Sequence, residues 1–116
     1  MTDENEKDLV WMGSSLKDLC EFPKMVVRKA GGELRKVQQG VDPSDWKSFD
    51  DVGPGTREIR LRDSDGIYRI MYVVKFAEAI FVLHCFHKTT QTTSKHDKEI
   101  AKQRYCSVVS ERRKLK

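Results

Sequence analysis

Two arginines lie at alternate positions of a short segment that is predicted to be a β-strand. Polar and apolar residues alternate through residues 57–62, so Ile59 and Leu61 point to one face while Arg60 and Arg62 point to the other. The two guanidinium groups then project from one surface about 7 Å apart. Arginines held in this way are suited to binding the phosphate groups of a polyanion.

Cationic and titratable side chains also occur on the two segments that follow. Arg69 lies in an otherwise apolar run, where an arginine must reach solvent, a carboxylate or a ligand. His84, His87 and Lys88 lie at the end of the next apolar run, so cations of neighbouring strands are expected to cluster. Because side chains alternate along a strand, the two histidines point to opposite faces, and at most one belongs to such a site.

These residue types suit the cleavage of RNA by its own 2′-hydroxyl group. A base must accept the hydroxyl proton, fixed cations must stabilise the charge on the phosphorus, and an acid must protonate the leaving oxygen. The candidate catalytic residues are Arg60, Arg62, Arg69, His84, His87 and Lys88. Arginines can take the place of metal ions in this role. No metal or small-molecule cofactor is expected, because the two histidines are on opposite faces and no other cluster completes a metal site.

An exposed polar sheet face explains the arginines alone at least as well. In that interpretation Arg60 and Arg62 pair with carboxylates on neighbouring strands and have no catalytic role. The addition of a histidine and of Lys88 at the end of the third strand favours the nuclease interpretation.

The surrounding pattern predicts one α+β domain. The expected order is an edge strand at 9–12, helices at 15–22 and 23–40, a loop at 41–56, a hairpin at 57–76, a strand at 79–86 and a helix from 95. Residues 15–18 and 94–97 are predicted capping boxes. Gly31 and Gly32 indicate that another element packs closely on the second helix or that this helix bends. The result is a small antiparallel sheet with helices packed on one face and a C-terminal helix.

Length and composition fit a single small domain spanning residues 1–116. The chain is 38% hydrophobic and carries a net charge of +4, which permits a polyanionic partner. Residues 1–8 form an acidic leader that is expected to be flexible, and residues from about 110 to 116 form a basic tail. Three cysteines without CxxC spacing predict a reduced, cytoplasmic protein. No apolar run reaches about 20 residues, so no membrane span is expected, and the acidic start of the chain does not fit a secretory signal, which would be basic and then apolar.

Six short motifs occur in order between residues 9 and 105. They are Trp11–Ser15, Phe22–Pro23, Val37–Gly40, Arg57–Arg60, Tyr68–Tyr72 and Leu83–Thr89. Together they resemble the phage-derived, HigB-like branch of the RelE/ParE toxin superfamily. The resemblance implies the RelE-like fold, ribosome-dependent cleavage of mRNA, and neutralisation by a helix-turn-helix, HigA-like antitoxin. It also implies that Arg60 and Arg62 form the basic strand of the family's site, with Arg69 and Lys88 beside them.

One position departs from this resemblance. Relatives often have two lysines in succession after the last strand, whereas Thr89 follows Lys88 here. Either Lys95 or the basic tail supplies the missing charge, or activity is reduced. Tyr105 is a weaker candidate for proton transfer than the histidines. Two alternatives keep the same fold: a ParE-like gyrase inhibitor without a nuclease site, and a phage-derived nucleic-acid-binding regulator that has lost catalysis.

Overall fold

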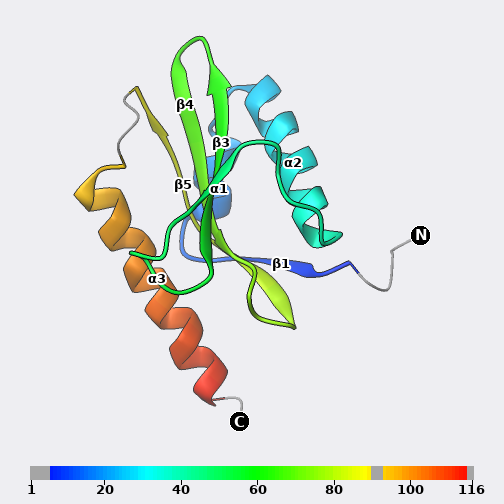
Figure 1. The fold of residues 1–116 in the computed structure, drawn as a ribbon. Coiled ribbons are helices and arrows are strands. Elements are labelled where there is room, and N and C mark those ends of the chain that lie inside the picture. The colour runs from blue at the N-terminus through cyan, green and yellow to red at the C-terminus, as the bar shows by residue number, and fades with distance from the viewer. Residues whose placement is uncertain (1–5, 90–92, 115–116) are drawn as a thin grey trace.

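The structure is a computed structural model that describes residues 6–89 and 93–114. Its elements are β1 (Asp8–Trp11), α1 (Ser15–Cys20), α2 (Lys24–Gln38), β2 (Trp46–Ser48), β3 (Thr56–Asp63), β4 (Gly66–Val73), β5 (Ala79–Lys88) and α3 (Lys95–Lys114). The predicted α+β class, the hairpin and the C-terminal helix are confirmed (Figure 1).

Five strands form one sheet in the order β1-β5-β4-β3-β2. β1 runs parallel to β5, and the other neighbours are antiparallel. β2 lies within the segment that was predicted to be a loop, with Trp46 opposite Ile59 of β3. Three residues are too few to show a strand period in the sequence, so this strand becomes visible only through its pairing.

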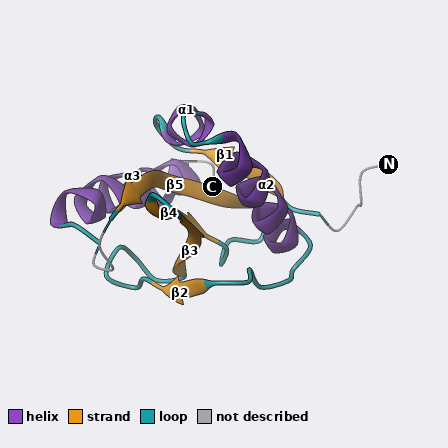
Figure 2. Ribbon diagram, turned by 90° about the horizontal axis from the view of Figure 1, so that it is seen from above, coloured by secondary structure: helices purple, strands orange, loops and turns teal. Residues whose placement is uncertain are grey.

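Helices cover both faces of the sheet. On one face, the apolar side of α2 packs against β3, β4 and β5, and Leu19 of α1 joins the same cluster. On the other face, α3 packs with Ala101, Tyr105 and Val108 against the strands. Figures 1 and 2 show α2 and α3 on opposite sides of the sheet. The C-terminal helix therefore covers the face that α2 leaves open.

The two predicted capping boxes have different outcomes. In the second, Ser94 Oγ donates to Asp97 Oδ2 at 2.6 Å and the Asp97 N–H donates to Ser94 Oγ at 3.1 Å, as predicted. The first prediction is wrong, because Ser14 is the N-cap of α1 and no side chain caps its amides. The hydroxyl of Ser15 instead donates to the Val82 carbonyl oxygen at 3.2 Å, so the sheet takes the group that capping would use.

The middle of α2 is open to solvent. Apart from the adjacent residues and the nearby backbone of α2 itself, no heavy atom lies within 4 Å of the position that a Cβ on Gly31 or Gly32 would occupy. Close packing by another described element, one of the two explanations expected from the sequence, is therefore not observed. The helix ends before Gly40, whose φ of +81° favours glycine.

Parts of the predicted leader and of the predicted tail have regular structure or tertiary contacts, and residues 1–5, 115 and 116 lie outside the described residues. Lys7 donates from Nζ to the carbonyl oxygens of Val74 and Phe76, both at 3.0 Å, and Asp8 already belongs to β1. α3 continues to Lys114, so most of the predicted basic tail is helical. None of the helices in the described part of the chain is long and apolar enough to cross a membrane.

Candidate functional site

Most of the candidate residues lie on the sheet face that α3 covers. The strand register places nine side chains in three rows across β3, β4 and β5: Arg62, Ile67 and Lys88, then Arg60, Arg69 and Phe86, then Glu58, Met71 and His84. Neighbouring strands lie about 5 Å apart, and successive rows about 7 Å apart. The cations of three strands thus cluster as the sequence predicted.

A β-bulge in β5 places His84 on this face. Met71 is opposite His84 and Tyr72 is opposite Val82, so Leu83 has no partner on β4. Both Leu83 and His84 lie on the α3 side as a result. No pattern in the local sequence predicts this bulge.

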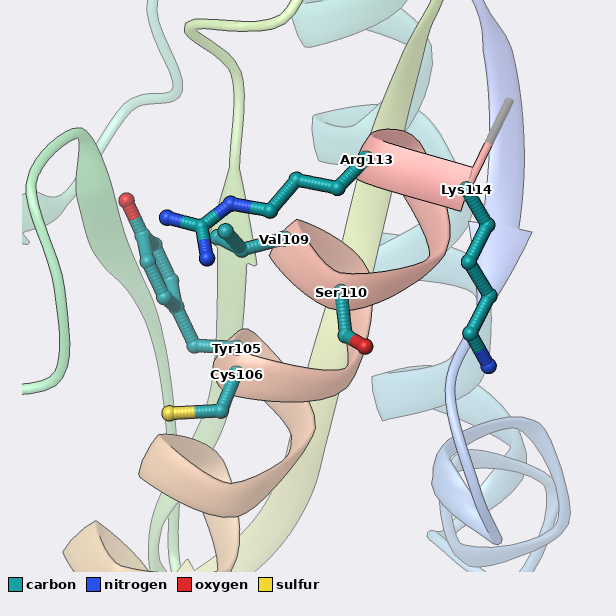
Figure 3. A pocket seen from close by; sticks show the side chains of 6 residues that line it. All are labelled: Tyr105, Cys106, Val109, Ser110, Arg113 and Lys114. Carbon is teal, nitrogen blue, oxygen red and sulfur yellow. The ribbon is translucent and has the colours of Figure 1, made fainter. Parts of the chain in front are cut away.

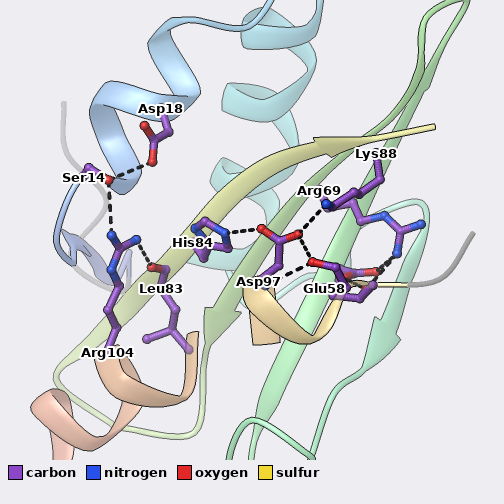
Figure 4. A network of polar contacts seen from close by, with 11 residues as sticks. Ser14, Asp18, Glu58, Arg69, Leu83, His84, Lys88, Asp97 and Arg104 are labelled. Atoms are coloured by element: carbon purple, nitrogen blue, oxygen red, sulfur yellow. Dashed lines mark hydrogen bonds and ion pairs between the residues drawn. The ribbon is translucent and has the colours of Figure 1, made fainter. Parts of the chain in front are cut away.

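Glu58 is the centre of a buried polar network (Figure 4). Its Oε1 accepts from Arg60 Nε at 3.0 Å and from Arg69 Nη1 at 3.1 Å, and its Oε2 accepts from Thr93 Oγ1 at 2.9 Å. Arg69 Nη1 also donates to Thr93 Oγ1 at 2.9 Å. Glu58 and Arg69 have no exposed surface. The guanidinium of Arg69 is therefore held in one orientation and is out of reach of solvent.

Asp97, at the start of α3, organises the second half of the network. Its Oδ1 lies 2.8 Å from His84 Nε2, and its Oδ2 lies 3.0 Å from Lys88 Nζ. Burial by itself would raise the pKa of this carboxyl group, but hydrogen bonds from Ser94, His84 and Lys88 outweigh it, so the pKa is lowered. The carboxylate is accordingly ionised at neutral pH.

His84 is held as a neutral imidazole beside this carboxylate. Burial lowers its pKa from the usual 6.5, and the contact with Asp97 opposes that effect only in part. The neutral ring places its proton on Nε2, because this nitrogen faces the ionised oxygen. Nδ1 then carries a lone pair, and it has no hydrogen-bond partner among the described residues. The ring stacks on Phe86 at 4.8 Å between centroids.

The cations that reach solvent lie at the edge of this network. The exposed side-chain fraction is 16% for Arg60, 33% for Lys88 and 54% for Arg62. Arg62 pairs with Asp45 at 3.1 Å, which leaves much of its guanidinium accessible. A phosphate group that approached this face would meet these three side chains first.

Two of the weaker candidates lie outside the network. His87 is on the α2 side of the sheet, as parity predicted, where it stacks on Tyr68 at 4.2 Å and its Nε2 lies 2.7 Å from the Asp65 carbonyl oxygen. Tyr105 donates from its hydroxyl to the Pro54 carbonyl oxygen at 2.7 Å. Within residues 6–89 and 93–114, no three His, Cys, Asp or Glu side chains lie together as metal ligands would.

Tyr105 borders a groove of about 510 Å³ along the C-terminal half of α3 (Figure 3). The groove is lined by Tyr105, Cys106, Val109, Ser110, Arg113 and Lys114. None of these residues makes a hydrogen bond or ion pair with a member of the network, as far as the chain is described. The groove is therefore separate from the candidate site.

The position of α3 is fixed by one further arginine. Arg104 donates to the Leu83 carbonyl oxygen at 2.8 Å and to Ser14 Oγ at 3.2 Å, as Figure 4 shows. Its side chain also passes so close to Gly13 that a Cβ there would lie 2.5 Å from Nε. Arg104 thus joins α3 to β5 and to the start of α1.

Three members of the site were not predicted from the sequence, namely Glu58, Thr93 and Asp97. Glu58 lies in the alternating segment 57–62 but was not singled out there, and Asp97 was expected only as part of the capping box at residues 94–97. A carboxylate that alternates with two arginines on one strand is a usable signal, because a buried arginine needs such a partner. Thr89 and Lys95 are both exposed, on either side of the network. That Lys95 supplies the positive charge missing at Thr89 stays a prediction.

Comparison with known proteins gives a family for the chain. Residues 17–106 match the family described as phage-derived protein Gp49-like. No curated protein sequence matches the chain.

Proposed function

Because the chain belongs to the phage-derived Gp49-like family, which is a RelE/toxin-like group, we propose that it is a toxin that cleaves mRNA on the ribosome without a metal ion. One observation carries the proposal. A neutral histidine bonded to an ionised carboxylate lies on the same sheet face as the partly exposed cations Arg60 and Lys88. The antitoxin would be a helix-turn-helix protein of the HigA type, and the toxin would act in the cytoplasm, where messages are translated.

Each step of the reaction has a candidate group on this face. Nδ1 of His84 is buried in the structure; once RNA binding exposes it, it accepts the proton of a 2′-hydroxyl, whose oxygen then attacks the adjacent phosphorus. Arg60 and Lys88 stabilise the additional negative charge on the phosphoryl oxygens. The bond to the 5′-oxygen breaks, and that oxygen takes the proton that His84 accepted, leaving a 2′,3′-cyclic phosphate and a 5′-hydroxyl. Glu58 and Asp97 act through the side chains that they orient.

The same geometry favours a second function in one respect. Arg69 is wholly buried and His84 is only 6% exposed, so neither is displayed as a catalytic group on an open surface would be. This burial supports a toxin-like protein that binds its target without cleaving RNA, either a ParE-like gyrase inhibitor or an inactive nucleic-acid-binding regulator. The network would then serve only to fasten α3 to the sheet.

Expression without the antitoxin separates these functions. Cells that express the chain are analysed for new 5′ ends in mRNA and, in parallel, for induction of the DNA-damage response. Lys88→Ala is the test variant, and Lys47→Ala on β2 is the control, since Lys47 is exposed and outside the network. The nuclease proposal expects new 5′ ends that disappear with Lys88→Ala and persist with Lys47→Ala. DNA damage with intact mRNA would instead support gyrase inhibition.

A further inference from the structure

The outward face of α2 carries several exposed cations and no exposed acid. The helix has five cations and one acid, an excess of four that equals the net charge of the whole chain. Four of its cations are exposed, namely Lys24, Arg28, Lys29 and Arg35, and we call them the α2 strip. Among the ion pairs of the described residues, α2 contributes only the fifth cation, Lys36, which pairs with Glu33. The strip is thus a concentrated charge that the chain itself does not neutralise.

The strip points away from the sheet. Successive helical residues are rotated by about 100°, which places Lys24, Arg28 and Arg35 opposite the buried residues of α2. The eleven helical steps from Lys24 to Arg35 extend for about 16 Å. Between Arg28 and Arg35 lie Gly31 and Gly32, above which the space is open. An extended partner can therefore approach the helix backbone closely between two cations.

The composition of the strip identifies the kind of partner. Protein interfaces have an extended apolar core, whereas the outward face of α2 offers one exposed large apolar side chain, Met25, and a pocket that Phe22 and Val27 line together with Lys24 and Arg28. The one acid of α2, Glu33, is already bonded to Lys36 and Ser44, so the cations of the strip remain complementary to a chain of phosphates. We propose that the α2 strip binds the phosphate backbone of RNA. The choice of RNA among polyanions rests on the proposed function.

This contact is distinct from the one that would be cleaved. α2 and α3 cover opposite faces of the sheet, and the network of Glu58 and Asp97 lies on the α3 side (Figures 1 and 2). A strand of RNA held against Arg60 and Lys88 is separated from the strip by the thickness of the sheet and of α2. The strip therefore binds a second stretch of RNA, and it anchors the protein while the other face meets the message.

Binding of an RNA that cannot be cleaved tests the strip by itself. The probe is a synthetic RNA hairpin with 2′-O-methyl riboses, which lack the attacking hydroxyl, and its affinity is measured at several salt concentrations. The variant Arg28→Gln/Arg35→Gln removes two charges from the strip. The matched control Lys47→Gln/Lys102→Gln removes two charges from exposed residues on β2 and α3. We expect about tenfold weaker binding for the strip variant only, with the salt slope reduced by about 1.5.

Several results would overturn the proposal. Equal weakening by the two double variants would show that only the total charge matters, and unchanged binding by the strip variant would show that the strip makes no contact. If the strip variant loses binding to poly-glutamate but still binds RNA, the partner of the strip is an acidic protein. A larger loss of affinity in the strip variant for a DNA hairpin of the same sequence than for the RNA hairpin would also count against the proposal. If strip-dependent RNA binding holds while the wild type produces no new mRNA ends, the strip stands and the proposed nuclease function fails.

Discussion

Replacing Arg69 should destabilise the fold, so that a loss of activity would not by itself identify a catalytic role. Arg69 and Glu58 form an ion pair at 3.1 Å, and neither side chain has exposed surface. Removal of one partner from a buried pair typically costs about 3 to 5 kcal/mol, because the remaining charge is left without compensation. Glu58 keeps its contacts with Arg60 and Thr93, so for Arg69→Ala we expect the lower end, about 3 kcal/mol. This loss is a large part of the stability of a domain of this size.

Urea unfolding followed by circular dichroism measures this loss. Arg62→Ala is the control in the next row of the same sheet face, and it should change stability by less than about 1 kcal/mol because its pair with Asp45 is exposed. The double variant Glu58→Gln/Arg69→Met removes both charges and keeps an acceptor for Arg60. It should be more stable than the sum of the two single variants predicts.

An Arg69→Ala protein with the unfolding midpoint of the wild type would refute this reasoning. It would mean that Glu58 is solvated, or that the start of α3 does not cover the pair. If the expected loss is found, a non-toxic Arg69 variant says nothing about catalysis. The site should then be mapped through Lys88 and Arg60, whose side chains reach solvent.

Three further outcomes follow from the contacts described. Lys88→Ala should abolish new mRNA ends yet change the unfolding free energy by less than about 1 kcal/mol, since its pair with Asp97 is partly exposed; a folded variant with full activity would exclude Lys88 from the site. Because burial holds the pKa of His84 below its usual 6.5, the unfolded chain binds more protons as the pH falls below that value. The unfolding free energy should therefore fall between about pH 7 and pH 5, and His84→Gln should flatten this dependence in urea titrations. Gly31→Ala should raise the unfolding free energy by about 1 kcal/mol, whereas Gly13→Ala, at a φ of +53° and against a neighbouring side chain, should lower it.

The order of the elements could be predicted because each long element has a clear period. The alternation in β3 placed Arg60 and Arg62 on one face, and the period of α2 identified its buried side. β2 could not be predicted, since its three residues depend on β3 for their structure. Ser15 was misassigned because a serine at a helix start can serve either the helix or a neighbouring strand, and only the tertiary structure decides between them.

The candidate site was predictable in its cations and not in its carboxylates. The pairing of β3 with β4 is enough to bring the arginines together. Asp97 comes from a different element and reaches His84 only when α3 docks. The same docking covers Arg69, so its burial could not be foreseen from an isolated strand. A prediction based on one hairpin alone therefore overestimates how much of its surface remains accessible to solvent in the folded protein.

The bulge in β5 also has an evolutionary consequence. Ile80 and Val82 face α2, and uninterrupted alternation would send His84, Phe86 and Lys88 to that side as well. The extra residue at Leu83 transfers this whole set to the α3 side in one event, with no substitution at any of the three positions. In a homologue that gained or lost one residue here, these side chains would lie on the opposite face of the sheet, although the sequence would be almost unchanged.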